Sequence, residues 1–298
     1  MENISIFGFE ALWSPYFFLF ITGCTCFYFF LINRKGDKFR KRENVSPKQM
    51  MYFTAAMVFI YALKGSPLDL LSHLMFSAHM IQMALLYLLV PPLLIAGIPV
   101  WMWKRFTAIP GIRQIFTFFT KPLLALILFN GLFSLYHFPA VFDFLKSGHF
   151  FHSAASIFLF FSALCMWWPL FNKFEDKNKL NGLMKIGYIF ANGMLLTPAC
   201  ALIIFSKTPL YLTYSDPASW MHAMQLCVPS GTLSGLNLSG PEMFNSLPVM
   251  DDQQLGGVAM KIIQEIIYGA VLASVFFNWA KEEREKDKKE EEAYKAHL

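Results

Sequence analysis

The feature that most constrains this chain is a set of apolar stretches, each of a length that suits a membrane-spanning helix. The stretch at 71–90 reads LSHLMFSAHMIQMALLYLLV, and a helix of about 20 residues crosses a bilayer. It nevertheless contains His73, His79 and Gln82. Polar groups are costly in hydrocarbon, so they usually face a bundle interior, a partner or a site.

Methionine and histidine share one face of this predicted helix. At about 100° per residue, Met75, His79 and Met83 fall on the same side. Imidazole and thioether together suit copper, and the thioether favours Cu(I). Ordinary packing of methionine and a hydrogen bond from His79 to a neighbouring helix would also explain the pattern.

Composition places the whole chain in a membrane. Of its 298 residues, 56% are hydrophobic and 15% are charged, where a soluble domain has about 25% charged residues. The short alternating segments of a membrane β-barrel are absent. The net charge of +5 comes with basic residues in short loops, where membrane topology explains them. We therefore expect an all-α, polytopic membrane helix bundle that contacts the lipid bilayer and binds no nucleic acid.

Seven spans are predicted, within a single transmembrane domain at 1–280. The third should break or kink at Pro91 and Pro92 and continue toward Ile98, and the sixth should be interrupted at Pro198. A long loop at 206–253 and a charged tail at 281–298, either a helical extension or disordered, complete the chain. The expected spans are 14–32, 49–63, 70–90, 122–138, 148–171, 182–205 and 254–280.

Basic residues predict the orientation of the bundle. They concentrate after the first, third, fifth and seventh spans, and the other loops contain only Lys64, Lys146 and Lys207. The positive-inside rule makes the basic side cytoplasmic. We therefore expect a multi-pass protein of the cell membrane with the N-terminus outside, the tail inside and the long loop outside.

Six of the seven histidines then fall near the outer side, and only His297 is cytoplasmic. His149 and His152 are spaced i, i+3, so their imidazoles can converge. Histidine is also tolerated at membrane interfaces, which would account for some of the six. The six predicted outer histidines are His73, His79, His137, His149, His152 and His222.

Two charged patterns lie in the last span. Lys261 and Glu265 are spaced i, i+4, and an intramembrane ion pair marks either a functional site or a structural pair that offsets two buried charges. Asp251 and Asp252 lie at the outer start of this span, where a helix N-terminus favours aspartate. No nucleophile–base pair, glycine-rich phosphate loop or HExxH motif occurs, so we expect no enzymatic activity.

Taken in order, several short motifs resemble the CtaG family, the assembly factors of caa-type cytochrome c oxidases. The resemblance covers nearly the whole chain. It implies a seven-span protein that helps to form the CuB centre of the oxidase catalytic subunit by handling copper. The motifs are His73…Ser77-Ala78-His79-Met80-Ile81-Gln82, Tyr136-His137-x-Pro139, His149-x-x-His152, Asp252-Gln253-Gln254-Leu255-Gly256-Gly257 and the opening Phe9-x-Ala11-Leu12-Trp13-Ser14-Pro15.

The chain departs from this family at one position. Many members have HMxxH where this chain has Met83 in place of the second histidine, which still permits copper and favours Cu(I). We expect His79 and Met83, with His149 and His152, to be the copper ligands. The further candidate metal-site residues are Met80, His73, His137 and His222.

Three other functions remain open from the sequence. Paired histidines on facing membrane helices can ligate haem b in an electron carrier. A scaffold could hold oxidase subunits without binding metal. A transporter could use Lys261 and Glu265, and broken helices near the membrane midplane would favour that function.

Overall fold

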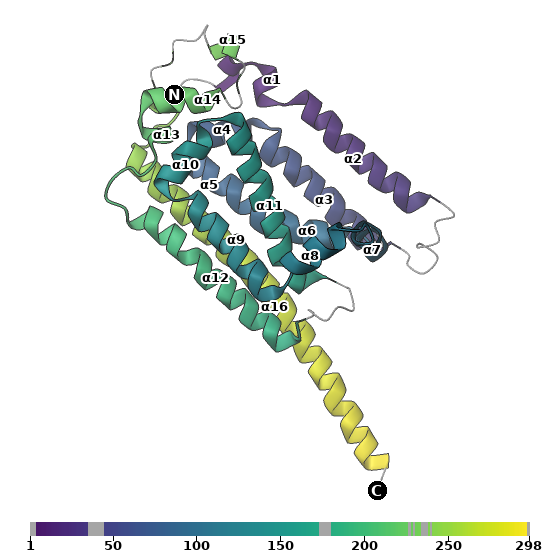
Figure 1. Ribbon diagram of the computed structural model, residues 1–298. Helices are drawn as coiled ribbons and strands as arrows, with labels where there is room; N and C mark the ends of the chain where they lie inside the picture. The colour runs from purple at the N-terminus through teal and green to yellow at the C-terminus, as the bar shows by residue number, and fades with distance from the viewer. Residues whose placement is uncertain are drawn as a thin grey trace.

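The computed structural model describes residues 4–34, 45–172, 180–225, 228, 230–233, 238 and 240–296. These residues form a bundle of helices without a strand (Figure 1). The longer helices are α2 (Pro15–Asn33), α3 (Pro47–Lys64), α9 (Pro122–Tyr136), α11 (His149–Phe171), α12 (Gly182–Phe205) and α16 (Val249–Ala296). The third predicted span consists of α4 (Pro67–Leu74), α5 (Phe76–Ala84), a π-helical turn η3 (Leu85–Leu89) and α6 (Val90–Gly97).

Short helices connect these elements at both ends of the bundle. Figure 1 shows α4, α10, α13 and α14 at the same end as the N-terminus, which we call the histidine end, while α16 projects past the other end. The short helices are η1 (Ile4–Phe7), α1 (Phe9–Leu12), α7 (Val100–Thr107), α8 (Ile112–Phe119), α10 (Pro139–Lys146), α13 (Leu212–Ser215), α14 (Pro217–Met224), α15 (Ser230–Leu233) and η4 (Pro241–Met243).

The predicted class, an all-α membrane bundle, is confirmed. Among the described residues, five helices are long and apolar enough to cross a membrane. The number rises to seven if α3 with α4, bent by 45°, and α8 with α9, bent by 81°, each make one span. The span count of seven and the orientation stay predictions. Many of the basic residues used for the orientation lie at 35–42 and 173–179, outside the described residues.

The helix predicted across 70–90 is interrupted, which corrects the expected span. Met75 has an extended backbone, with φ −133° and ψ 134°, so α4 ends at Leu74 and a new helix begins at Phe76. Met75 therefore lies between two helices and does not continue the face of α5 that carries His79.

A carboxylate from the last helix stabilises this interruption. Asp252 Oδ2 accepts a hydrogen bond of 2.7 Å from the Phe76 amide, and Oδ1 accepts one of 3.4 Å from the Ser77 amide. The Ser77 hydroxyl also donates to Asp252. The first amides of a helix lack intrahelical acceptors and carry a partial positive charge, so a carboxylate is their best partner. Asp252 thus caps α5, whereas aspartate at this position was expected to serve its own helix.

The prolines at 91 and 92 do not break the helix, which continues as far as the predicted extension toward Ile98. Helix continues to Gly97 because the turn before the prolines widens to π-helix, with the Val90 amide bonded to the Leu85 carbonyl. Pro91 has no N–H for the Tyr87 carbonyl. The indole of Trp167 on α11 donates to that carbonyl instead, at 3.1 Å.

Two further sequence expectations differ from the structure. Helix α12 runs without interruption through Pro198, because membrane helices tolerate proline where hydroxyl groups and neighbouring helices satisfy the backbone. The carbonyl that Pro198 leaves without an N–H is that of Met194, and the Thr197 hydroxyl bonds to the preceding carbonyl, that of Gly193, at 2.8 Å. Helix α16 starts at Val249 rather than near 254. Its continuation through the charged tail to Ala296 confirms the helical extension, one of the two expectations for the tail.

We predict that Asp252→Ala lowers the free energy of unfolding by about 2 kcal/mol or more. It removes hydrogen bonds to a charged group, each of which contributes about 1.5–3 kcal/mol. The neighbouring Asp251 is exposed, so Asp251→Ala is the matched control. Thermal unfolding in detergent should show a large loss for Asp252→Ala alone, and equal losses would contradict the capping role.

Helices α3 and α6 pack so closely that only glycine fits at position 97. A Cβ there would lie 2.5 Å from the Phe53 backbone nitrogen. We predict that Gly97→Ala costs about 1–3 kcal/mol, as overpacking does in other cores. Gly131→Ala on α9 is the control, because a Cβ at Gly131 meets nothing within 4 Å. A similar unfolding temperature for both variants would contradict this close contact.

Candidate functional site

Four of the predicted histidines come together at the histidine end, each from a different element. His73 lies on α4, His79 on α5, His137 directly after α9 and His152 on α11. The ring centroids of His73 and His152 are 5.6 Å apart, and those of His79 and His137 are 6.3 Å apart. We call these four residues the histidine cluster. Three of its side chains are buried, with His79 only 2% exposed, and His152 is half-buried.

Backbone carbonyls determine the tautomers of two of these rings. His73 Nδ1 lies 2.9 Å from the Asp69 carbonyl, and His137 Nδ1 lies 2.8 Å from the Phe133 carbonyl. A carbonyl only accepts, so each Nδ1 carries the hydrogen and each Nε2 keeps its lone pair in the neutral ring. Neither Nε2 has a hydrogen-bond partner among the described residues. Both rings therefore present a buried lone pair on Nε2.

The other two rings also lack partners within the described part of the chain. Both nitrogens of His79 and the Nδ1 of His152 are buried without a hydrogen bond, as is the Tyr136 hydroxyl. The ring of Tyr136 stacks on His79, with centroids 6.1 Å apart. Buried polar atoms are normally satisfied, so such a concentration of exceptions requires an explanation. A ligand that accepts lone pairs would satisfy several of them together.

An aromatic cover, formed by Phe76, Phe142, Tyr211 and Tyr214, packs against the cluster. Phe142 lies 5.3 Å from the His79 ring, and Tyr211 lies 4.6 Å from both phenylalanines. The cover includes the part of the long loop around α13. This loop therefore begins by packing against the histidine cluster.

Hydrogen bonds hold that part of the loop in place. The Tyr211 hydroxyl donates to the His137 carbonyl at 2.9 Å, and the Tyr214 hydroxyl donates to the Ser72 carbonyl at 2.6 Å. Asp143 accepts from the backbone and hydroxyl of Thr213. The cover is therefore attached to the same elements that carry His73 and His137.

A buried positive charge lies beside the cluster. Lys146, at the end of α10, is 1% exposed, and its ammonium lies 5.8 Å from the Phe142 ring centroid. It acts electrostatically on His73, His79 and His152. In the sequence, Lys146 is only one of the few basic residues in the predicted outer loops. Nothing in its sequence position indicated that it would be buried.

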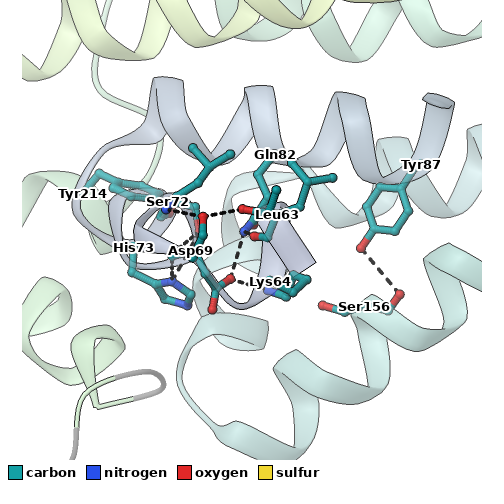
Figure 2. A network of polar contacts seen from close by, with 12 residues as sticks. Leu63, Lys64, Asp69, Ser72, His73, Gln82, Tyr87, Ser156 and Tyr214 are labelled. Carbon is teal, nitrogen blue, oxygen red and sulfur yellow. Dashed lines mark hydrogen bonds and ion pairs between the residues drawn. The ribbon is translucent and has the colours of Figure 1, made fainter. Parts of the chain in front are cut away.

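Asp69 organises the polar contacts behind His73 (Figure 2). Its side chain pairs with Lys64 at 2.6 Å and accepts from Gln82 Nε2 at 2.8 Å, while its carbonyl accepts from His73. Gln82 also donates to the Leu63 carbonyl, so it connects α5 to the corner between α3 and α4. The sequence analysis missed Asp69, although it lies four residues before His73 and therefore one helical turn away.

The remaining candidate residues lie outside this cluster or beside it. His149 and His222 are exposed, so the expected pairing of His149 with His152 is replaced by the contact between His152 and His73. Met80 packs toward Gly256 of α16, and Met83 is buried one turn after His79. His297 lies outside the described residues.

A ready-made metal site is absent from the described side chains. They contain no group of three or more His, Cys, Asp and Glu residues placed to hold a metal ion. The structure brings four imidazoles close together without arranging them around one point.

Comparison with known proteins places this chain in a family. The family model described as "Cytochrome c oxidase caa3 assembly factor" (Caa3_CtaG) matches residues 26–282. That range contains the whole histidine cluster and Asp252. Neither the curated proteins nor the solved structures gave a match. Since the family model covers most of the sequence, the chain belongs to the caa3 cytochrome c oxidase assembly factor family.

Proposed function

We propose that this assembly factor binds Cu(I) at the histidine cluster and helps to form the CuB centre of the oxidase catalytic subunit. The family supplies the role in oxidase assembly, and its description names an assembly factor rather than a catalyst. One observation supports the metal: the buried, unpartnered Nε2 atoms of His73 and His137, whose Nδ1 atoms bond to carbonyls.

This arrangement is the one that metal-binding imidazoles use. A ligating histidine almost always donates its other ring N–H to a carbonyl, carboxylate or water, which fixes the ring and makes the free nitrogen more basic. His73 and His137 both have such a partner. His79 lies between His137 and the rest of the cluster and has both nitrogens available. The proposed ligands are two neighbouring pairs of rings, His79 with His137 and His73 with His152.

Three properties favour Cu(I) over other metals. Imidazole suits several transition metals, and a thioether such as that of Met83 shifts the preference toward Cu(I). Lys146 places a positive charge near the cluster, and its repulsion of a monovalent ion is half that of a divalent one. Cu(I) also accepts few ligands, so pairs of neighbouring rings are sufficient although the described residues contain no three-ligand group.

The surroundings suit temporary storage of the ion. The aromatic cover reduces contact with water, and the cluster lies at one end of the bundle instead of its centre (Figure 1). Release would require Tyr211 and Tyr214 to move, which breaks their hydrogen bonds to the carbonyls of His137 and Ser72. A site of this kind can pass its ion to a partner docked in the same membrane.

We predict that the purified protein, loaded with Cu(I) under reducing conditions and washed, retains about one copper per chain at ligands of this type. His73→Ala with His137→Ala should remove most of it, because both oriented lone pairs are lost. His149→Ala with His222→Ala is the matched control, since both side chains are exposed. Mass spectrometry of metal content and an absorption spectrum provide the readout.

The alternatives give different results in this experiment. No copper above the level of the variant lacking the four clustered histidines would contradict the proposal and favour a metal-free scaffold. A Soret band would favour a haem carrier. In cells, the copper content and activity of the oxidase should fall with His73→Ala and His137→Ala and stay unchanged with the control pair.

A further inference from the structure

An ion pair on the outside of the bundle lies within the apolar part of α16. Lys261 Nζ lies 2.8 Å from Glu265 Oε1, and it also donates to the Thr197 hydroxyl of α12 at 3.0 Å. The Glu265 side chain is 63% exposed. Along the helix, Glu265 lies about midway between Val249, where α16 begins, and Lys281, the first charge of its polar extension. The carboxylate therefore faces outward at the depth of the hydrocarbon.

Such an exposed charge is unfavourable if lipid alone surrounds it. Ionisable side chains within membrane helices almost always face a bundle interior, a water-filled cavity or a partner. Lys261 offsets the charge on one side only, and among the described residues no other side chain bonds to the Glu265 carboxylate. A hydrogen-bond donor from another protein would satisfy its remaining lone pairs.

The surface next to Glu265 can accept a helix at close range. Gly269 and Ala273 follow at successive turns on the same face, and both are exposed. A Cβ at Gly269 would meet nothing within 4 Å, so this face is open. Small residues at this spacing allow the backbones of two membrane helices to approach closely. We call Glu265, Gly269 and Ala273 the Glu265 face.

We propose that the Glu265 face docks a transmembrane helix of an oxidase subunit that presents a hydrogen-bond donor to Glu265. This inference rests on the oxidase-assembly role and does not depend on copper. A second copy of this chain is a poorer partner. A symmetric dimer in one membrane pairs the same face of both copies and would bring the two Glu265 carboxylates together, and like charges at an interface are unfavourable.

The length of α16 supports a partner on this side. Residues 281–295 of α16 are all exposed, and Figure 1 shows this part projecting beyond the bundle. Among the described residues, it is supported by i, i+3 and i, i+4 ion pairs, such as Lys295 with Glu291. A helix docked on the Glu265 face can therefore follow α16 out of the membrane without meeting another described element of this chain.

Photo-crosslinking in membranes tests the proposal. A benzoylphenylalanine is placed at Ala273 and, as control, at Ile127 on the exposed side of α9. The position at 273 should yield an adduct that mass spectrometry identifies as an oxidase subunit, and the position at 127 should not. An adduct with a second copy, with an unrelated protein, or with lipid alone would overturn the proposal.

Two substitutions test separately how the charge of Glu265 and the close approach at Gly269 contribute to docking. Glu265→Gln should lower the yield of the adduct about tenfold, the effect expected for losing a charge-assisted hydrogen bond. Glu285→Gln on the projecting part is the control. Gly269→Leu should abolish the adduct by blocking close approach, and Gly131→Leu on α9 should not. An unchanged yield with both Glu265→Gln and Gly269→Leu would overturn the proposal.

Copper retention distinguishes this inference from the proposed function. Glu265 lies about 20 Å along α16 from Asp252 at about 1.5 Å per residue, so its variants should retain copper as the unsubstituted protein does. Loss of the adduct with copper retained therefore concerns docking alone. If the His73 and His137 variant loses copper but still forms the adduct, the result bears on copper binding and leaves the docking proposal unaffected. A changed unfolding temperature would identify a variant that misfolds.

Discussion

The contact between Asp252 and the first amides of α5 determines the arrangement of the rest of the site. It makes the break at Met75 stable, because the freed amides receive a buried carboxylate in place of water. The break allows α4 to leave the axis of α5, so His73 and His79 come from two helices with different directions. An uninterrupted helix would fix these two histidines at one angular offset. The cluster thus depends on an acidic residue 176 positions further along the chain.

The polar groups of the histidine end fall into a satisfied set and an unsatisfied set. Asp69, Gln82 and Lys64 bond to one another and to the backbone (Figure 2), and they hold the corner from which His73 projects. Beyond that corner, the Nε2 atoms of His73, His79 and His137 have no hydrogen-bond partner among the described residues. A rigid support behind open ligands is the general form of a binding site. In a region whose only role was packing, these unsatisfied polar atoms would cost free energy without any compensating function.

Hydropathy and charge were sufficient to predict the helical class, the approximate position of the long helices and the histidine-rich end. They could not predict the break at Met75, because apolar residues continue through it without glycine or proline. Nor could they show that Pro91 is tolerated, since the Trp167 indole that satisfies the Tyr87 carbonyl comes from α11. Histidine spacing favoured pairing His149 with His152, whereas in the structure the His152 ring contacts the His73 ring of α4 instead. In each case the deciding group is distant in sequence.

The continuity of α16 has a mechanical consequence. One helix of 48 residues, about 70 Å long at about 1.5 Å per residue, contains the carboxylate that caps α5, the Glu265 face and the charged projection. A helix transmits rotation and axial displacement along its length because each turn is bonded to the next. Any partner that turns or shifts the projecting part therefore applies torque where α16 meets α5, at the hydrogen bonds of Asp252 and at the packing of Gly256 against Met80. Helix α16 therefore connects the projecting end of the molecule to the end that carries the histidine cluster.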